Sequence, residues 1–515
     1  AALGYRALAN NTTADNNTAV GTDALFTNTT GTNNVAVGYQ AGTAVTTAGE
    51  ATLIGRHAGL ALTTGNSNTF IGGRAGAATT TSTENVAVGQ AALLTNTTGA
   101  SNTALGRGAL LSNTTASNNT AVGRNSLVSN TTGANNVAVG TLALDANTTG
   151  DHNTAVGTSA LGANTTADFN TAFGIEALKV NTTGDKNVAI GALALDANTT
   201  GRLNTALGFQ ALTLNTTADG NTAIGNDALP ANTTGAGNVA VGSGSLYANT
   251  TASNNTAVGL NSLVANTTGH SNTAIGSTAL DAATTASFNT AVGHGSLGAT
   301  TTGHSNTAVG RSALITNTTG DANVAVGMDA LISNTTADNN TAVGYEALLV
   351  NTTGALNTAV GYSALDANTT ASHVTAVGNA ALGANTTGTR NTAVGSESAD
   401  AVTTGQDNTA IGSLALSADT KGNFSTAIGR GALKVQNFTS ATSAHNTAVG
   451  YSAGEAVTTG TDNTIIGSLA GDAITDGNTN SALGSFALSA NQRGDRNTAI
   501  GHESLLTMNP SGDVD

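Results

Sequence analysis

The sequence predicts an all-β fold, a parallel β-solenoid of about 30 rungs, and three observations lead to this prediction. The glycine of an AVG-like phrase recurs with a constant period of 17 from Gly4 to Gly429 and again from Gly450 to Gly501. The segments between these glycines are rich in β-branched residues, and they are too short for a helical hairpin repeat. Charged residues make up 9% of the chain and aromatic residues 3%, so large side chains suffice for one long, thin core but not for several globular ones.

Each rung is numbered here from the asparagine of its NTAVG phrase, which gives the consensus N-[TV]-A-[VIL]-G-x-x-[AS]-L-x-x-N-T-T-[GA]-x-x. The pattern predicts short strands at positions 1 to 5, 7 to 11 and 12 to 14, with corners at the glycine of position 5 and at the last three positions. Pro230 falls at position 10, where a corner needs no hydrogen-bond donor. At about 4.8 Å per rung, 30 rungs would extend roughly 140 Å.

The repeat also divides the chain into segments. We expect a regular solenoid over residues 1–433, an irregular step with an insertion over 434–446, continued repeats over 447–507 and a tail over 508–515. The irregular step lies between Gly429 and Gly450, which are further apart than the period of the other rungs. The chain opens inside a repeat, without a recognisable signal peptide, so we expect a mature form or an excerpt of a longer protein.

Compensating changes of volume identify the expected interior of a rung. Leucine usually occupies position 9; where Gly or Ala replaces it, position 12 usually becomes apolar and position 3 often becomes larger. Close-packed interiors demand such compensation, so we predict that positions 3, 9 and 12 share the interior. The predicted interior residues include Leu25, Leu53, Phe70, Leu144, Leu161, Leu195, Val45, Leu62, Val457, Ile465 and Ile474.

Strand alternation turns positions 2 and 4 to the opposite face. Position 4 is apolar in all 30 rungs, and position 2 is mostly threonine, with valine in others. An apolar stripe on a soluble protein marks an interface, so we predict a symmetric homo-oligomer; a wider monomeric core is the alternative. The predicted interface residues are Val20, Val35, Val37, Val86, Val88, Val137, Val139, Val188, Ile190, Val239, Val241, Val258, Val324 and Val326.

The residue pattern favours no catalytic, metal or cofactor site. The histidines occupy varied positions in the rung, so we expect them to face solvent: His57, His152, His270, His294, His304, His373, His445 and His502. Aspartate recurs at the last corner (Asp15, Asp151, Asp185, Asp219 and Asp338), but the G-G-x-G-x-D calcium phrase is missing, which leaves calcium as a minor alternative. No serine or histidine stands out among near-identical rungs, so an enzyme is not expected.

The NTT phrase of most rungs is formally an acceptor sequence for N-glycosylation. Its asparagine, at position 12, aligns with those of adjacent rungs, where amides can hydrogen-bond along the stack. Where position 12 is apolar, as at Val45, the acceptor sequence is lost but the rung persists. We therefore expect a structural role, with glycosylation as the alternative. Ice binding is not expected, because the two adjacent threonines point to opposite sides and cannot form a flat double rank.

The phrase NNVAVG at Asn33–Gly38 and Asn135–Gly140, and its variant ANVAVG at Ala322–Gly327, resembles the N-S-V-A-I-G phrase in the head repeats of YadA-like trimeric autotransporter adhesins. The likeness covers essentially the whole chain and extends to phage tail-fibre shafts. It implies a left-handed parallel β-roll and a homotrimer whose axis is lined by residues such as Val137 and Val139. The period of 17 is longer than is usual in that family, which implies an extra short side bearing NTT. No coiled-coil stalk, membrane-anchor barrel or tail-fibre chaperone domain is visible.

These observations predict a structural extracellular fibre, or an adhesin head or shaft, that mediates attachment to a cell or other surface. A phage tail-fibre shaft for host recognition is the alternative, and a glycan-binding, lectin-like module is the alternative of another class. The expected partners are the chain itself, as a homotrimer, and a surface receptor of glycan or protein. Nucleic acid is not expected, because the net charge is −15 without a basic patch. Membrane insertion of this segment is not expected either, because no apolar run approaches about 20 residues. The expected location is extracellular, on a cell or virion surface.

Overall fold

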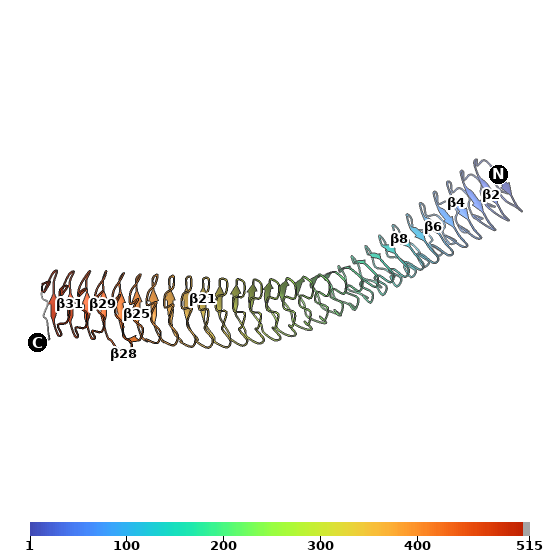
Figure 1. Ribbon diagram of the computed structural model, residues 1–515. Coiled ribbons are helices and arrows are strands. Elements are labelled where there is room, and N and C mark those ends of the chain that lie inside the picture. The colour runs from blue at the N-terminus through green and yellow to red at the C-terminus, as the bar shows by residue number, and fades with distance from the viewer. Residues whose placement is uncertain (508–515) are drawn as a thin grey trace. The chain divides into compact units, whose positions relative to one another are not determined.

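A computed structural model describes residues 1–507, and the chain forms a parallel β-solenoid of 17-residue rungs, as the sequence predicts (Figure 1). Every regular element within residues 1–507 is a strand. The chain divides into two compact units, one of residues 1–255 and one that begins at Thr256. The tail predicted at residues 508–515 lies outside the described residues.

The first unit contains one short strand per rung, and all are parallel. The strands are β1 (Ala2–Leu3), β2 (Thr18–Val20), β3 (Val35–Val37), β4 (Thr52–Ile54), β5 (Thr69–Ile71), β6 (Val86–Val88), β7 (Thr103–Leu105), β8 (Thr120–Val122), β9 (Val137–Val139), β10 (Thr154–Val156), β11 (Thr171–Phe173), β12 (Val188–Ile190), β13 (Thr205–Leu207), β14 (Thr222–Ile224) and β15 (Val239–Val241).

The second unit repeats this arrangement and adds a small strand pair at the irregular step. Its strands are β16 (Thr256–Val258), β17 (Thr273–Ile275), β18 (Thr290–Val292), β19 (Thr307–Val309), β20 (Val324–Val326), β21 (Thr341–Val343), β22 (Thr358–Val360), β23 (Thr375–Val377), β24 (Thr392–Val394), β25 (Thr409–Ile411), β26 (Gly422–Asn423), β27 (Thr426–Ile428), β28 (Thr442–Ser443), β29 (Thr447–Val449), β30 (Thr464–Ile466), β31 (Ser481–Leu483) and β32 (Thr498–Ile500).

Within each unit, the strands that the structure describes pair with their successors in register. Thr154 of β10 lies between Val137 of β9 and Thr171 of β11, so equivalent positions stack directly. The irregular step does not interrupt this stacking, because Thr426 of β27 pairs with Thr447 of β29 in spite of the longer connection. The extra residues are absorbed on another side of the rung, where β26 pairs with β28.

The prediction of three strands per rung is wrong, because in the regular rungs only positions 2 to 4 form a strand. Positions 7 and 9 adopt left-handed backbone conformations, as Leu142 (φ 56°) and Leu144 (φ 53°) illustrate, and a strand cannot continue through them. The turns nevertheless stack through backbone hydrogen bonds, such as that from the Leu144 N–H to the Ala160 carbonyl oxygen at 3.0 Å. The rest of each rung is therefore a stack of turns.

The core runs along the inside of the rungs. All eleven residues assigned to the interior from the sequence are fully buried. Positions 1, 8 and 15 are also buried, as at Asn136, Ala143 and Gly150, and the sequence did not indicate this. These positions carry small or polar side chains, which volume compensation cannot identify.

Where position 9 loses its leucine, larger side chains take up the space. A Cβ on Gly42 would lie 2.5 Å from Cδ1 of Leu53, and one on Gly76 would lie 2.6 Å from Cε2 of Phe70. Leu53 and Phe70 occupy position 3 and are completely buried. The exchange of volume between positions 9 and 3 is thus a direct contact inside the solenoid.

Candidate functional site

The outer face of the strand ladder carries an apolar stripe. Within each unit the side chain at position 3 points inward, and those at positions 2 and 4 point outward. None of the fourteen predicted interface residues is buried: Val86, Val137 and Ile190 are exposed and the other eleven are half-buried. Other position-4 side chains project further, such as Phe173, which is 55% exposed. Each unit therefore presents stacked apolar side chains on a regular sheet surface.

The asparagines of the NTT phrases form a buried ladder. The Nδ2 of Asn147 donates to Oδ1 of Asn130 at 2.8 Å and to the carbonyl oxygen of Gly150 at 3.0 Å, while its Oδ1 accepts from Nδ2 of Asn164 at 2.9 Å. Asn147 has no exposed surface. The amide that would carry a glycan is therefore enclosed and fully bonded, so the folded protein cannot be glycosylated at Asn147.

A second ladder is formed by the asparagines at position 1. Nδ2 of Asn136 donates to the carbonyl oxygen of Gly150 at 2.8 Å, and Oδ1 of Asn136 accepts from the N–H of Asn153 at 2.8 Å. The position-1 and position-12 amides thus meet at the same carbonyl group, that of Gly150. Buried amides must be hydrogen-bonded to be tolerated, and this shared carbonyl explains why both asparagines recur in one rung.

The aspartates of the last corner cap backbone groups. Oδ1 of Asp151 accepts a hydrogen bond from the N–H of Ala134 at 2.6 Å, and Oδ1 of Asp168 accepts from the N–H of Asp151 at 2.7 Å. Both aspartates occupy position 16, and each caps position 16 of the preceding rung. Within residues 1–507 no group of three or more His, Cys, Asp or Glu side chains could hold a metal ion. Through these hydrogen bonds, Asp151 and Asp168 have a structural role in connecting neighbouring rungs.

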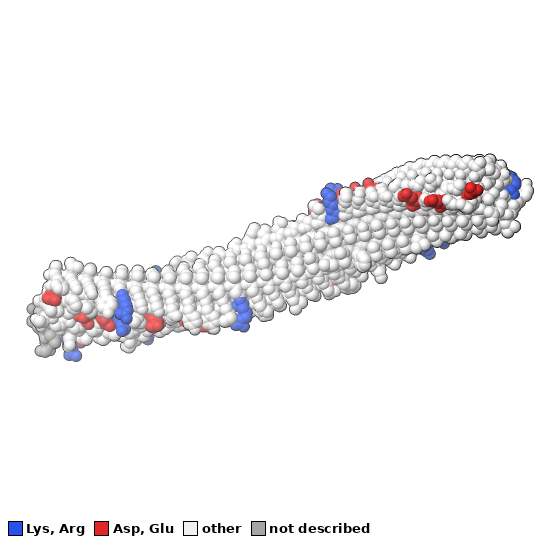
Figure 2. All heavy atoms as spheres, turned by 90° about the horizontal axis from the view of Figure 1, so that it is seen from above, with Lys and Arg blue, Asp and Glu red and all other residues white. Residues whose placement is uncertain are grey.

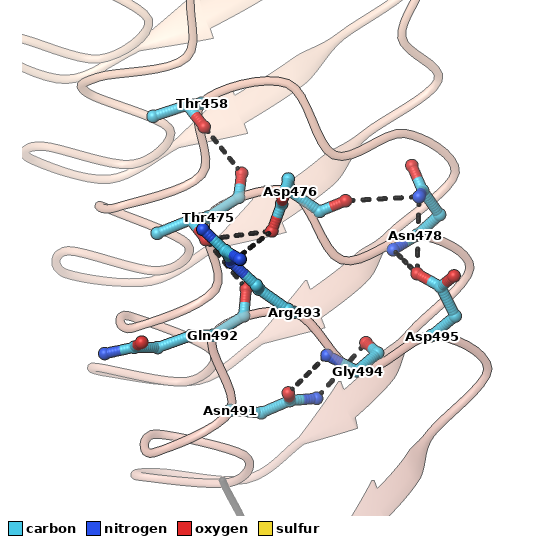
Figure 3. A network of polar contacts seen from close by, with 9 residues as sticks. All are labelled: Thr458, Thr475, Asp476, Asn478, Asn491, Gln492, Arg493, Gly494 and Asp495. Carbon is cyan, nitrogen blue, oxygen red and sulfur yellow. Dashed lines mark hydrogen bonds and ion pairs between the residues drawn. The ribbon is translucent and has the colours of Figure 1, made fainter. Parts of the chain in front are cut away.

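Figure 3 shows the same corner in the second unit. Asp495 turns toward Asn478, and its Oδ1 accepts from the Asn478 N–H at 2.6 Å. On the adjoining side, the hydroxyl of Thr458 donates to the carbonyl oxygen of Thr475 at 2.9 Å, and that of Thr475 donates to Gln492 at 2.9 Å. The threonine at position 13 and the residue at position 16 thus both connect neighbouring rungs.

The histidines do not form a site. None of the eight is buried. His152 stacks on Phe169 with ring centroids 5.0 Å apart, and His445 lies 3.4 Å from the carboxylate of Asp462. His57 has its pKa lowered by partial burial and by the nearby Arg56 and Arg74.

A buried polar cluster at the irregular step was not foreseen from the sequence. Asp419 takes the place of the position-12 asparagine, has no exposed surface, and accepts from Nε2 of Gln436 at 2.6 Å. Oε1 of Gln436 accepts from Nδ2 of Asn446 at 2.9 Å. The sequence contains a signal for this cluster, because Asp419 and Gln436 both depart from the asparagine of the consensus at position 12. Through Gln436 the cluster connects Ser425 and Asn446, which occupy position 1 on the two sides of the insertion, so its role is structural.

Charged side chains are sparse, and most of the face seen in Figure 2 is uncharged. Arg390 forms an exposed ion pair with Asp407 at 2.6 Å. The hydrogen bond in this pair raises the pKa of Arg390 and lowers that of Asp407. Within residues 1–507 the structure contains no helix able to cross a membrane.

A set of half-buried carboxylates lies at position 10. Burial raises the pKa of each of these groups: Asp145, Asp281, Asp366, Asp400 and Asp472. Among the described residues, no hydrogen-bond partner is found for the buried Oδ1 of Asp400. Ionisation of these groups therefore works against the folded state at neutral pH.

Replacing Asp400 with asparagine is expected to stabilise the second unit at pH 7. The folded-state pKa of Asp400 lies above the ordinary value of 3.8, so ionisation favours the unfolded chain at neutral pH. That penalty shrinks as the pH falls through the raised pKa and vanishes below the unfolded-state value. Denaturant unfolding at pH 7 and at about pH 3 should therefore give a difference between variant and wild type only at pH 7.

Asp407→Asn is the matched control for this titration. The pKa of Asp407 is lowered by its hydrogen bond to Arg390, so the variant should be less stable than wild type at pH 7, by a small amount because the pair is exposed. A stabilising effect of equal size in both variants would contradict the role assigned to burial.

Comparison with protein-family models finds no match for this chain, and comparison with curated proteins finds none either.

Proposed function

We propose that the chain is the repetitive segment of a homotrimeric extracellular fibre that holds a binding end away from a cell or virion surface. Its role is structural spacing and attachment, with a glycan or protein receptor as the partner. The resemblance to YadA-like head repeats and tail-fibre shafts supports this proposal, since both are assemblies of repetitive rolls. The observation that carries it is the apolar stripe at positions 2 and 4, which leaves side chains such as Phe173 and Leu207 exposed.

The area of the apolar stripe is suited to binding a second copy of the chain. A three-residue strand is about 10 Å long and strands lie about 4.8 Å apart, so the fifteen rungs of the first unit offer roughly 700 Å². Specific interfaces bury about 800 Å² per partner, so one unit alone comes close to that size. A surface with a repeat of one rung is matched best by a surface with the same repeat, which another copy supplies.

The buried ladders support the spacing role. Within each unit, backbone hydrogen bonds connect neighbouring rungs, and hydrogen bonds between side-chain amides add to them in most rungs. Each rung is therefore stabilised by its neighbours, and the length of the solenoid can be changed by whole rungs. Rigidity then comes from the repeated contacts and does not depend on the identity of any one rung.

Deleting residues 154–204, which are three whole rungs, tests this role. The deletion joins Asn153 to Thr205 and preserves the consensus register, so the chain should fold, self-associate and be shorter by about 14 Å. Small-angle scattering and sedimentation velocity would measure both properties. A control deletion of residues 154–196 breaks the register and should aggregate or unfold. Loss of folding or of association in the three-rung deletion would contradict the proposal.

A further inference from the structure

The corner of the first unit has a polar notch where position 16 is a glycine. The notch has a volume of about 370 Å³, with Gly49 at its floor and walls made by Thr30, Thr32, Thr47, Glu50, Asn66 and Ser67. All six wall residues are exposed. The volume lies within the range of small-molecule sites, about 300–1,000 Å³.

The missing side chain of Gly49 leaves a backbone donor open. In several other rungs a position-16 side chain caps the preceding rung, and Gly49 is itself capped in this way, its N–H donating to Oδ1 of Asn66 at 2.8 Å. Gly49 has no side chain with which to cap Thr32 in turn. No atom within residues 1–507 accepts a hydrogen bond from the Thr32 N–H. Thr32 lines the notch, and a Cβ on Gly49 would lie 3.8 Å from the Thr32 nitrogen.

Two side chains of the notch, Glu50 and Asn66, each use one polar atom in a hydrogen bond within the protein and have a second polar atom that a ligand could bind. Glu50 accepts from the hydroxyl of Ser67 through Oε2 at 3.0 Å, and its Oε1 has no partner within the described residues. Asn66 is oriented by its bond to Gly49, and its Nδ2 has no partner within residues 1–507. The lining of the notch thus includes one acceptor, Glu50 Oε1, and two donors, the Thr32 N–H and Asn66 Nδ2.

This set of groups selects a class of ligand. A hydroxyl group donates one hydrogen bond and accepts two, so two neighbouring hydroxyls can donate a hydrogen bond to Glu50 and accept hydrogen bonds from Thr32 and Asn66. An anion is disfavoured by the carboxylate of Glu50, and the lining contains no lysine or arginine. A metal ion would find only one carboxylate. We propose that the notch over Gly49 binds a neutral, polyhydroxylated ligand, a hexose unit of a glycan.

The site lies within one chain and does not depend on self-association. Its floor is open because Gly49 interrupts a column that carries Asp, Asn or Ser in several other rungs. A Cβ on Gly49 would lie 3.2 Å from the carbonyl oxygen of Thr32, so any side chain there would enter the notch. The backbone of Gly49 is not in the left-handed region, and an aspartate at this position matches other rungs.

Two variants test the site. Gly49→Asp should fill the notch and cap Thr32 while preserving the fold, and Glu50→Gln should remove the charged acceptor. The control is Glu84→Gln, because Glu84 makes the same bond to a serine, Ser101, at 3.1 Å, but position 16 of its rung is Thr83. Thermal unfolding would verify that all three variants are folded.

The probes are labelled neutral tetrasaccharides of glucose, galactose and mannose, with a galacturonate tetrasaccharide as the charged comparison. We expect at least one neutral probe to bind with a Kd of about 1 mM or tighter, measured by fluorescence polarisation. Binding should weaken at least about tenfold in Gly49→Asp and Glu50→Gln, and remain unchanged in Glu84→Gln. Absence of neutral-probe binding at about 10 mM, or equal binding by wild type and Gly49→Asp, would overturn the proposal.

Discussion

Replacing Gly140 with alanine is expected to lower the free energy of unfolding of the first unit by at least about 3 kcal/mol. Gly140 has φ 139°, a conformation that residues with a side chain rarely adopt, and it stacks on Gly157 of the next rung. A Cβ on Gly140 would lie 2.7 Å from the carbonyl carbon of Gly157. Backbone strain and this clash act together, so the rungs on either side must separate. Denaturant unfolding followed by circular dichroism would measure the loss.

Gly162→Ala is the matched control for Gly140→Ala. Gly162 has an ordinary φ and lies at position 10, and the nearest atoms to its added Cβ would be 3.3 Å away. Its replacement should change the unfolding free energy by less than about 0.5 kcal/mol. Equal losses in the two variants would mean that glycine at position 5 is not required for stacking.

Replacing Val139 with aspartate is expected to weaken self-association at least about 1,000-fold, which corresponds to roughly 4 kcal/mol. Val139 is half-buried in the single chain and lies at position 4 of β9. In the proposed trimer three such carboxylates would approach each other at an apolar axis, where an unpaired charge is strongly disfavoured. Sedimentation velocity over a range of concentrations would measure the change.

Val128→Asp is the control, since Val128 is also half-buried but occupies position 10 on another face. It should leave the sedimentation coefficient of the assembled form unchanged. If both variants dissociate equally, or if neither does, the stripe is not the interface.

The period, the parallel stacking and the absence of register shifts could be predicted from the sequence, because equivalent residues must stack when units of one length repeat. The exchange of volume between Gly76 and Phe70 was also visible in the sequence, since close packing links the two positions directly. The number of strands was not predictable, because leucines such as Leu144 fit a strand pattern yet adopt a left-handed backbone. Their strain is offset by hydrogen bonds between rungs, which no local pattern reveals.

The notch and the aspartate caps could not be predicted from the sequence, for a different reason. Asp151 and Gly49 occupy the same position of the rung. Their structural role depends on which backbone N–H group of the preceding rung lacks a hydrogen-bond acceptor. Sequence alone gives the residue types but not the direction of that N–H. From the sequence, aspartate at this corner therefore left calcium only as a minor alternative, and no residue pattern distinguished Gly49.

Sedimentation equilibrium of the wild-type chain at micromolar concentration tests the central claim, that the stripe holds copies of the chain together. The chain has a mass of 49.8 kDa, and the account predicts a species of three times that mass. A single species of 49.8 kDa across the concentration range would contradict it.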